Sequence, residues 1–348
     1  MKKKILIVGA NGYLGSNLYL YLELKGYDCY NHDIDYFKSN LLYNCKKFQK
    51  LKNNKNEVTI KDLKKFHSVI FLAGFSNDPF GDLKPSQFYK PTVRYTLKVA
   101  KMCKLLNINF IFPSSCSVYG MSDIKKSLSE RSKTAPVTYY SKNKIEIEDK
   151  LKKLSSKKFN PIMLRLATIF GLSPRMRFDI VINMLSGMAI VNKKITLNSN
   201  GLAWRPHLHI EDACQAFHNS IIWKPKNQER FLILNVGDNK NNTTIIKIAE
   251  IIKKKLKNCK IEFQNKSDGL FINKNVSDGV DKRSYKVNFN KIKKVFPLFK
   301  TKWLVEKGIE DLLKNLKILQ MNKKKLTDIR FHRLKYYEFL KKKNKLFF

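Results

Sequence analysis

The chain has 348 residues, of which 43% are hydrophobic and 12% aromatic, and its formal net charge is +41. This composition excludes a disordered chain, and the length is enough for one large domain or two joined ones. No stretch of 18 apolar residues occurs, which excludes a membrane-spanning helix, and the six cysteines show no Cys-x-x-Cys spacing. We therefore expect a cytoplasmic protein with buried, reduced thiols and no metal site.

The positive charge is carried mainly by lysine. The chain has 69 Lys and Arg against 28 Asp and Glu, and only ten of the basic residues are Arg. A partner rich in phosphate, such as a nucleic acid or an anionic membrane surface, is one explanation of such a charge. Nucleic-acid-binding proteins use Arg interleaved with aromatic residues, whereas these lysines are spread over every segment. The sequence therefore favours a solvated lysine surface and predicts no nucleic-acid partner.

Apolar runs alternate with helical patterns through the first 172 residues. Strands are predicted at 5–8, 28–33, 69–72, 110–112 and 162–166, and helices at 13–25, 87–106 and 141–154. Thr59, with Asp62 three residues later, is typical of a helix N-cap. This succession predicts an α/β protein with a Rossmann-type, doubly wound parallel sheet over residues 1–172.

The pattern changes after residue 172, where turn-rich stretches separate short elements. Residues 173–320 are expected to form mainly a smaller α/β substrate lobe, while segments near 206–224 and 231–236 return to the first domain. Residues 321–348 hold lysines and aromatics at helical spacing. We interpret this tail as a packed or fraying terminal helix rather than as a membrane-binding or dimerising one.

A glycine-rich turn follows the first predicted strand. Gly9, Gly12 and Gly15 are spaced three apart, one residue wider at the start than the usual dinucleotide-binding pattern. Such a turn presents backbone N–H groups and a positive helix end to a phosphate, so the expected ligand is a dinucleotide. Asp33 ends the second predicted strand, where a carboxylate accepts both ribose hydroxyls, and Asp35 is the reserve candidate. No arginine lies nearby in the sequence to favour a 2′-phosphate, so NAD is expected rather than NADP.

A phenol, an ammonium and a hydroxyl occur in a pattern that suits acid–base chemistry. Tyr140 and Lys144 are four residues apart, on one face of a predicted helix. Ser115 lies in a serine-rich run after a central strand, at the edge where open α/β sheets place their ligands. A hydroxyl there can bond a substrate oxygen while Tyr140 takes or gives its proton, and the ammonium of Lys144 favours the phenolate.

Together these motifs resemble the short-chain dehydrogenase/reductase superfamily, in particular its extended branch of nucleotide-sugar epimerases and dehydratases. The resemblance covers about residues 3–315 and follows the family's order: the glycine turn, the run VIFLAG at 69–74, Ser115 three residues before Val118-Tyr119-Gly120, and Tyr140 with Lys144. It implies a Rossmann fold with a smaller substrate lobe. It also implies NAD as cofactor, a nucleotide-diphosphate sugar as substrate, and Ser115, Tyr140 and Lys144 as catalytic residues.

The same resemblance implies the remaining site residues. Arg205 and Arg283 correspond to arginines that hold a sugar-nucleotide diphosphate, a role that suits a bidentate guanidinium, and residues 164–171 correspond to a segment that lines the substrate cleft. The expected NAD contacts are Gly9, Asn11, Gly12, Tyr13, Leu14, Gly15, Asp33, Leu72, Ala73, Gly74, Ser114, Tyr140 and Lys144. The expected substrate contacts are Ser76, Ser117, Thr168, Arg205 and Arg283.

The chain departs from the family's pattern at three positions. Phe71 stands where the family usually has His, Thr92 where it usually has Asn at the start of the long helix, and Thr168 where Asn is common near the diphosphate. These differences leave the redox chemistry possible and weaken an assignment of the substrate.

Members of the family begin by moving a hydride from a sugar carbon, usually C4, to NAD+. A 4,6-dehydratase also needs an acid and a base beside the catalytic hydroxyl, and Cys116 and Ser117 occupy those positions, which disfavours a dehydratase. The run Ser-Ser-Cys is also similar to GDP-fucose synthase, but alignment on Val118 shifts Cys116 by one position, so we interpret it as a packing residue. We therefore predict a 4-epimerase that acts through a transient 4-keto sugar in surface polysaccharide biosynthesis. The alternatives are a hexose or heptose 4-dehydrogenase or reductase and a non-catalytic dinucleotide-binding module.

Two further expectations concern recognition and assembly. Residues 264–268, Arg175 and Arg177 are candidates for base or sugar recognition, interpreted as exposed polar residues. The resemblance also implies a homodimer that pairs through the helices at 87–106 and 141–154.

Overall fold

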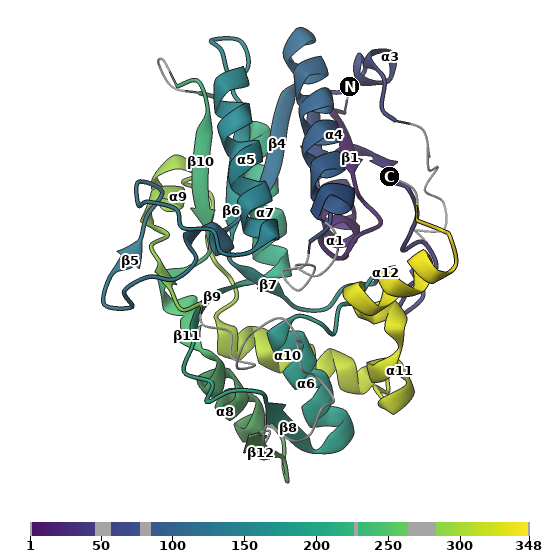
Figure 1. Ribbon diagram of the computed structural model, residues 1–348, viewed down its shortest axis with the longest axis vertical. Helices are drawn as coiled ribbons and strands as arrows, with labels where there is room; N and C mark the ends of the chain where they lie inside the picture. The colour runs from purple at the N-terminus through teal and green to yellow at the C-terminus, as the bar shows by residue number, and fades with distance from the viewer. Residues whose placement is uncertain (1, 46–56, 77–84, 226–228, 264–282, 347–348) are drawn as a thin grey trace.

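The computed structural model of the chain describes residues 2–45, 57–76, 85–225, 229–263 and 283–346. A parallel sheet with its helices forms the upper part of the molecule in Figure 1, and a smaller lobe lies below it. Within the described ranges, no helix combines the length and apolar character needed to cross a membrane. No group of three or more His, Cys, Asp or Glu side chains in these ranges is arranged to hold a metal ion.

The main sheet has six parallel strands in the order β10-β6-β4-β3-β1-β2. Their bounds are β1 (Lys4–Val8), β2 (Asp28–His32), β3 (Ser68–Phe71), β4 (Asn109–Ser115), β6 (Ile162–Leu166) and β10 (Leu232–Val236). From β1 the chain passes to β2 at one edge of the sheet, and it then returns to the other side of β1, where β3, β4, β6 and β10 follow in order. The strand order therefore reverses between β1 and β3. In such sheets ligands bind at this crevice, beyond the carboxyl ends of the strands.

Both faces of the sheet are buried. Four helices cover them: α1 (Tyr13–Leu24) and α7 (Ile210–Ile222) on one face, and α4 (Pro85–Leu105) and α5 (Tyr139–Leu154) on the other. Ile5 and Ile7 belong to the core on the α1 side, while Leu6 and Val8 belong to the core on the α4 side. This alternation explains why β1 and β3 are mainly apolar in the sequence.

The smaller lobe is built from segments on both sides of α7. It contains β8 (Lys194–Leu197) paired with β12 (Lys260–Phe263), the helices α6 (Val181–Asn192), α8 (Ile245–Lys255) and α10 (Val305–Ile318), and a three-stranded sheet of β7 (Thr168–Phe170), β9 (Trp204–His209) and β11 (Asn242–Thr244). A two-stranded ladder of β5 (Ser127–Leu128) and β13 (Lys286–Val287) and the helix α9 (Asn290–Val295) lie at the side of β10.

The C-terminal residues fold back onto the first domain. After α11 (Lys323–Thr327), the helix α12 (Arg333–Lys342) packs its tyrosines against aromatic side chains that follow β2 and β3. Tyr337 has its ring centroid 5.6 Å from that of Phe37 and 4.9 Å from that of Phe75. Figure 1 shows α12, in yellow, beside the junction of the two parts of the molecule.

The predicted fold class is confirmed, and the differences are local. β2 ends at His32, so Asp33 lies just beyond it, and α5 begins at Tyr139, which places Tyr140 in its first turn. The predicted N-cap at Thr59 is present as a full capping box of α3 (Ile60–Leu63). The segment at 206–224 forms most of β9, which belongs to the small sheet, and then α7, which covers the main sheet. The segment at 231–236 forms β10, which extends the main sheet beside β6.

Candidate active site

A cavity of about 780 Å³ opens at the carboxyl ends of β1, β3, β4 and β6. Its walls come from the glycine turn, the ends of these strands, the start of α5, the small lobe and α12. Every residue expected to contact NAD or substrate, or to act in catalysis, lines this cavity except Asn11, whereas Asp35 and Arg175 do not line it. The structure therefore brings together residues that are nearly 270 positions apart in the chain, Arg283 and Gly15 among them.

At two positions of the glycine turn, only glycine fits. A Cβ atom on Gly9, where φ is +94°, would lie 2.7 Å from the backbone nitrogen of Ala73, and one on Gly15 would lie 2.3 Å from the carbonyl oxygen of Gly9. Gly12 is the N-cap of α1, and no described side chain caps that helix. The first N–H groups of α1 therefore face the cavity with the positive end of the helix, an arrangement that suits a diphosphate.

Asn11 holds the turn from beneath instead of lining the cavity. It is 1% exposed, and its backbone N–H donates to Asp33 Oδ2 over 2.8 Å while its amide nitrogen donates to Asp35 Oδ1 over 2.7 Å. Asp33 also accepts from the backbone N–H of Asp35, so both carboxylate oxygens are oriented by backbone donors. Burial raises the pKa of Asp33, and these two hydrogen bonds oppose the rise. The carboxylate is thus held at the cavity wall, where ribose hydroxyls can reach it.

Arg175 corrects two expectations drawn from the sequence. It is 1% exposed rather than solvated, and it lies beside the acidic pair although it is far from it along the chain. Its guanidinium donates to Asn11 Oδ1 over 3.0 Å and to the carbonyl oxygens of Phe37 and Lys38. An arginine is therefore close to Asp33 in space, although none is close in the sequence.

Arg177 is also buried, with 7% of its surface exposed. It pairs with Asp179 through two hydrogen bonds of 2.8 and 3.0 Å and donates to the carbonyl and hydroxyl oxygens of Ser76. Ser76, expected to contact substrate, thus binds Arg177 at the cavity wall. The candidates at 264–268 lie outside the described residues.

The start of α5 positions the phenol and the ammonium. Thr138 and Ser141 form a reciprocal capping box, which fixes the first turn, where Tyr140 lies. The Nζ atom of Lys144 is 5.4 Å from the ring centroid of Tyr140 and donates to the carbonyl oxygen of Pro113 over 2.7 Å. Burial lowers the pKa of Lys144 from 10.5 to about 7, and the carboxylate of Glu148 opposes this shift.

Three serines at the end of β4 have different environments. Ser115 Oγ accepts from the backbone N–H of Ser117 over 3.1 Å, which leaves its own proton to donate. Ser114 is buried and donates its proton to Glu148 Oε1. Ser117 Oγ is buried at the cavity wall and has no hydrogen-bond partner among the described residues. An orphaned hydroxyl at this place is a donor and acceptor that a ligand can satisfy.

The two arginines expected to hold a diphosphate lie together. Arg205 Nη1 donates to the carbonyl oxygens of Trp204 and Arg283, and the guanidinium lies 5.3 Å from the ring centroid of Tyr285. Thr168 begins β7 at the same wall. Cys116, in contrast, is 1% exposed and donates to the carbonyl oxygen of Arg165, and burial raises its pKa. Its thiol is a packing group and does not line the cavity.

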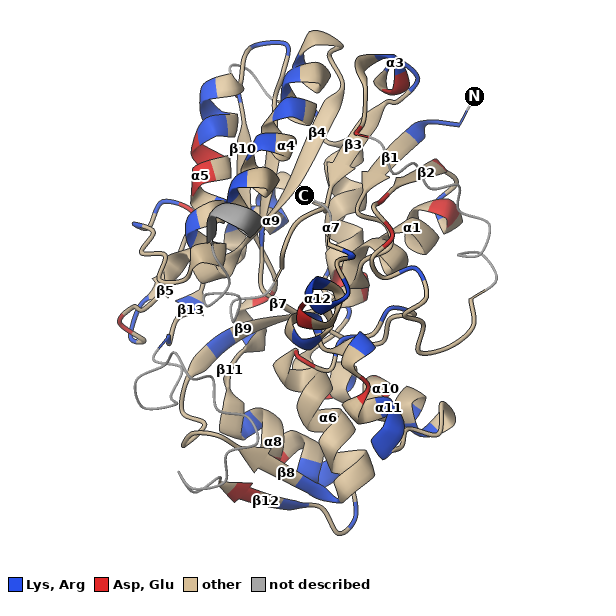
Figure 2. Ribbon diagram, turned by 45° about the vertical axis from the view of Figure 1, so that its right-hand side comes forward, with Lys and Arg blue, Asp and Glu red and all other residues tan. Residues whose placement is uncertain are grey.

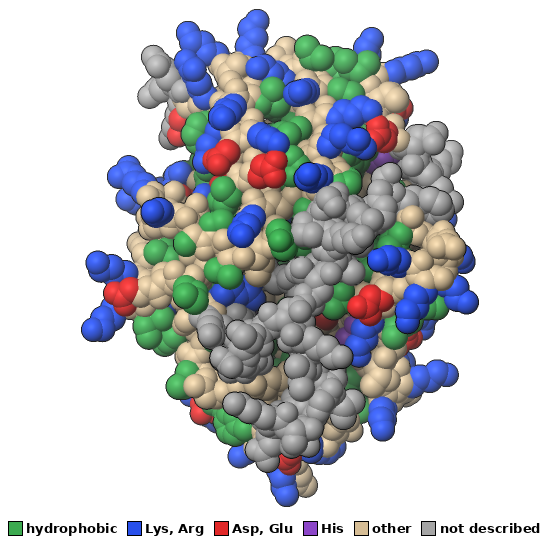
Figure 3. All heavy atoms as spheres, in the orientation of Figure 1, with side chains coloured by type: hydrophobic (Ala, Val, Ile, Leu, Met, Phe, Trp, Pro, Cys, Tyr) green, Lys and Arg blue, Asp and Glu red, His purple; other side chains and the backbone are tan. Residues whose placement is uncertain are grey.

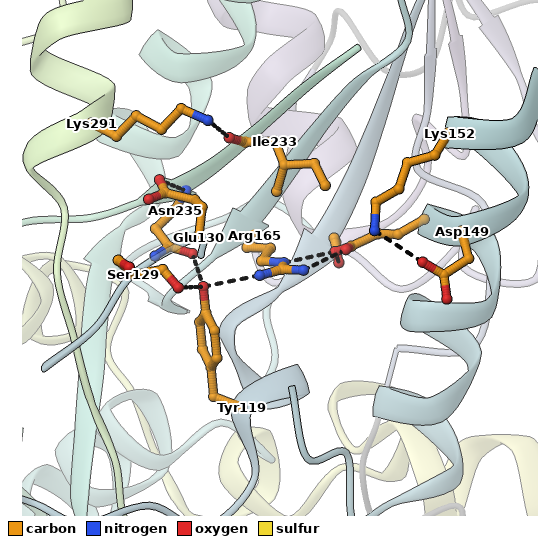
Figure 4. Close-up of polar contacts among 11 residues, drawn as sticks. Tyr119, Ser129, Glu130, Asp149, Lys152, Arg165, Ile233, Asn235 and Lys291 are labelled. Carbon is orange, nitrogen blue, oxygen red and sulfur yellow. Dashed lines mark hydrogen bonds and ion pairs between the residues drawn. The ribbon is translucent and has the colours of Figure 1, made fainter. Parts of the chain in front are cut away.

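The sequence analysis missed a buried polar network behind the serines. Figure 4 shows Arg165 at its centre: Arg165 donates to Glu148 over 2.6 and 2.9 Å and to the phenol oxygen of Tyr119 over 3.0 Å. Tyr119 in turn donates to Asn235 Oδ1 over 2.7 Å. An arginine inside an apolar strand was the only available sign in the sequence. Its partners come from α5 and from the turn after β4, and the network continues through Tyr119 to β10.

Two residues of α12, Arg333 and Tyr337, also line the cavity and were not predicted from the sequence. The helical spacing of the tail predicted a helix, but nothing in the sequence indicated which surface it would cover.

Comparison with known proteins identifies the family. The sequence profile of the NAD dependent epimerase/dehydratase family matches residues 5–237, which is more than half of the chain. The chain belongs to this family. The NAD dependent epimerase/dehydratase family uses NAD, and the residues of the cavity fit it: the glycine turn leaves a cradle at the uncapped end of α1, and Asp33 stands where ribose hydroxyls would lie. NAD is therefore the cofactor.

Three curated relatives each match between 62% and 72% of the chain. The bifunctional polymyxin resistance protein ArnA of Wigglesworthia glossinidia brevipalpis is 26% identical over 277 residues, 72% of this chain and 41% of that protein. An uncharacterized protein, PB2B2.11, of Schizosaccharomyces pombe is 24% identical over 262 residues, 64% of this chain and 71% of that protein. The dTDP-D-glucose 4,6-dehydratase of Dictyostelium discoideum is 25% identical over 248 residues, 62% and 54% of the two chains. The chain thus spans about half the length of two of these relatives.

Solved structures share the whole fold. The UDP-glucuronic acid 4-epimerase from Bacillus cereus, in complex with UDP-glucuronic acid and NAD, has a TM-score of 0.73 and 21% identity, covering 91% of this chain and 99% of that one. The NDP-hexosamine 5,6-dehydratase TunA has a TM-score of 0.76 and 15% identity, covering 91% and 98%. MoeE5 in complex with UDP-glucuronic acid and NAD has a TM-score of 0.74 and 17% identity, covering 90% and 99%. At these identities the likeness establishes the fold.

Proposed function

We propose that the protein is an NAD-dependent nucleotide-sugar 4-epimerase. One observation carries this proposal: a single cavity joins the glycine turn, the group of Ser115, Tyr140 and Lys144, and the arginine pair. A dinucleotide bound along the glycine turn and a sugar nucleotide held by the arginine pair would place a sugar carbon beside the phenol of Tyr140. The similarity to a UDP-glucuronic acid 4-epimerase supports the substrate class.

Each proposed catalytic residue has a separate task. The phenolate of Tyr140 takes the proton from the C4 hydroxyl of the sugar, and the ammonium of Lys144 stabilises that phenolate before the transfer. Ser115 donates its proton to the same sugar oxygen, because its Oγ is already oriented as an acceptor by the N–H of Ser117. When bound, the cofactor would supply a hydride acceptor as NAD+ for the oxidation at C4 and a hydride donor as NADH for the reduction that follows.

The assignment to an epimerase rests on two features of the cavity: the absence, among the described residues, of an acid–base pair beside Ser115, and the presence of two arginines. A 4,6-dehydratase needs an acid and a base beside the catalytic hydroxyl, where this chain has the packing thiol of Cys116 and the hydroxyl of Ser117. Inversion at C4 needs the keto sugar to turn while its diphosphate stays bound. Arg205 and Arg283 are suited to that anchoring, since a guanidinium can bind a phosphate group through two hydrogen bonds.

A panel of UDP-, GDP-, CDP- and dTDP-sugars, with NADH absorbance and product NMR, tests the proposal. An epimerase converts one sugar into a pair of C4 epimers with no lasting absorbance at 340 nm. A build-up of NADH with a released keto sugar would instead identify a 4-dehydrogenase. Absence of turnover with every sugar, together with intact NAD binding, would identify a non-catalytic dinucleotide-binding module.

The setting of this activity is proposed with it. A nucleotide-sugar epimerase of the cytoplasm would supply a sugar for surface polysaccharide biosynthesis, with no nucleic-acid partner. Lys and Arg side chains are spread over the face shown in Figure 3, with acidic residues among them, and do not form one continuous stripe. Such a distribution supports a solvated surface over a nucleic-acid groove.

A further inference from the structure

Arg333, the first residue of α12, is a buried cation with little to bind. It is 3% exposed, and its guanidinium carbon lies 3.7 Å from the ring centroid of Phe37. Its Nη1 atom donates weakly to the carbonyl oxygen of Arg330 over 3.5 Å, and its Nη2 atom is buried with no partner among the described residues. Buried guanidinium groups are usually paired, so this one calls for a counter-group.

The position of Arg333 is fixed by the backbone rather than by its own charge. Its N–H donates to Asp179 Oδ2 over 3.0 Å, and Asp179 makes the bidentate ion pair with Arg177 described above. The start of α12 is thereby attached to the segment that leads into α6. The side chain of Arg333 can therefore face the cavity without an acidic partner of its own.

Electrostatics around Arg333 favour an anionic ligand. Burial and the neighbouring Arg177 lower the pKa of Arg333 to about 10, with Asp179 opposing them. A negative group in the cavity would reverse this shift, because it would stabilise the charged guanidinium.

The neighbours of Arg333 locate that group along the cavity. Tyr337, one turn later on α12, interacts electrostatically with Asp33 at the ribose end. Arg177 interacts electrostatically with Tyr13, at the start of α1, and with Tyr140. Arg333 itself contacts Phe37 after β2, and its N–H is joined through Asp179 and Arg177 to Ser76 after β3. Because β1 lies between β2 and β3 in the sheet, these contacts place Arg333 near the glycine turn that follows β1, in the middle of the cavity wall. In an extended dinucleotide, the diphosphate occupies this middle position.

We propose that Arg333 binds the diphosphate of the dinucleotide, so that the C-terminal helix forms part of the cofactor site. The glycine turn would contact that diphosphate through backbone N–H groups and α12 through a guanidinium. This assignment goes beyond the proposed reaction, since it holds whichever sugar is converted.

Titration calorimetry on the full chain, stripped of nucleotide, tests the proposal with NAD+, ADP, adenosine and UDP. Arg333→Met should weaken NAD+ and ADP by about 10- to 100-fold, the effect of losing a charge-assisted hydrogen bond, and should leave adenosine and UDP unchanged. Arg333→Lys, which keeps the charge, should recover part of the loss. Arg330→Met is the matched control, because that side chain is exposed and pairs with Asp328. Its affinities should equal those of the unchanged chain.

Two results would overturn the proposal. Unchanged affinity of Arg333→Met for NAD+ and ADP would remove Arg333 from the cofactor site, and a loss confined to UDP would assign it to the sugar nucleotide instead. If the variant does not fold, hydrogen exchange of the unchanged chain gives the answer. ADP should slow exchange across 333–342 and adenosine should not, whereas equal exchange with both would contradict a diphosphate contact.

Discussion

Glu148 lies one helical turn beyond Lys144 on α5, and its carboxylate opposes loss of the proton from the Lys144 ammonium. Glu148 is completely buried and makes a bidentate pair with Arg165, through hydrogen bonds of 2.6 and 2.9 Å. Ser114 donates to the same carboxylate. The charge state of the proposed catalytic lysine is thus connected to an ion pair in the core of the first domain.

We expect the stability of the ligand-free protein to depend on pH through Lys144. Its folded pKa of about 7 lies below the unfolded value of 10.5, so the folding penalty of burying it is complete below pH 7 and declines as the pH rises towards 10.5. Between pH 7 and 9 the unchanged protein should gain about 2 kcal/mol in unfolding free energy relative to Lys144→Met. Urea unfolding of both proteins at both pH values measures this difference. Parallel pH dependences would contradict the burial of this ammonium.

Glu148→Gln should destabilise the protein strongly. The substitution leaves the guanidinium of Arg165 buried without its counter-charge, which costs about 3–5 kcal/mol of unfolding free energy. Glu146→Gln is the matched control on the same helix, because Glu146 pairs with Lys150 at the surface and should contribute less than about 0.5 kcal/mol.

A double variant tests the mechanism of that loss. Replacing Arg165 by Met in the Glu148→Gln background removes the unpaired charge, so part of the stability should return. If the double variant were less stable than Glu148→Gln by the full effect of a second core substitution, the unpaired charge would not be the cause. Chemical unfolding of the unchanged protein, Glu148→Gln, Arg165→Met and the double variant completes the double-mutant cycle.

Tyr140→Phe should lower turnover by about 10²–10⁴ while NAD+ remains bound, because a phenol that moves a proton is lost and the ring is kept. Tyr139→Phe is the control: the neighbouring side chain is 47% exposed and should be replaceable without effect. Steady-state kinetics on the active sugar nucleotide, with NAD+ affinity measured separately, distinguishes a chemical role from a binding one. Full activity of Tyr140→Phe would exclude this residue from the mechanism.

The predicted homodimer should depend on salt if it forms through α4 and α5. Figure 2 shows many Lys and Arg positions, in blue, along these two helices, and Lys98, Lys101, Lys142 and Lys150 are all exposed. Two copies of such a surface repel each other, and salt screens that repulsion. Sedimentation velocity should therefore show tighter association at 0.5 M NaCl than at 0.05 M. Association that weakens with salt would place the interface elsewhere.

The parallel arrangement of the main sheet could be predicted because its signals are local. β1 and β3 are mainly apolar runs, and a helix follows each of β1, β3 and β4, so a parallel sheet is expected from the βα succession. The same locality placed Tyr140 and Lys144 on one helical face, since their spacing is fixed by the helix itself. The glycine turn could also be predicted, because Gly9 and Gly15 stand where a Cβ atom would clash with the backbone.

The remaining features depend on contacts between distant segments, which no local pattern reports. Arg175 reaches the loop after β2 across more than 130 residues, and the tail brings Arg333 to the same loop across nearly 300. Asn11 was expected at the cofactor because it lies within the turn, but its polar atoms are used by Asp35 and Arg175. Polar side chains in a turn can face either way, and only their partners decide which.

Asp33→Ser should change the preference between the two nicotinamide dinucleotides. Asp33 supplies the carboxylate expected to accept the ribose hydroxyls and to repel a 2′-phosphate, and the guanidinium of Arg175 lies close enough to interact with it. Removing the carboxylate should weaken NAD+ by about tenfold, the effect of losing a hydrogen bond to a charged group, and should weaken NADP+ less or strengthen it. Asp28→Ser, at the start of β2 and away from the cavity, is the control. Fluorescence titrations with both dinucleotides measure the ratio of affinities, and an unchanged ratio in Asp33→Ser would show that another residue selects the cofactor.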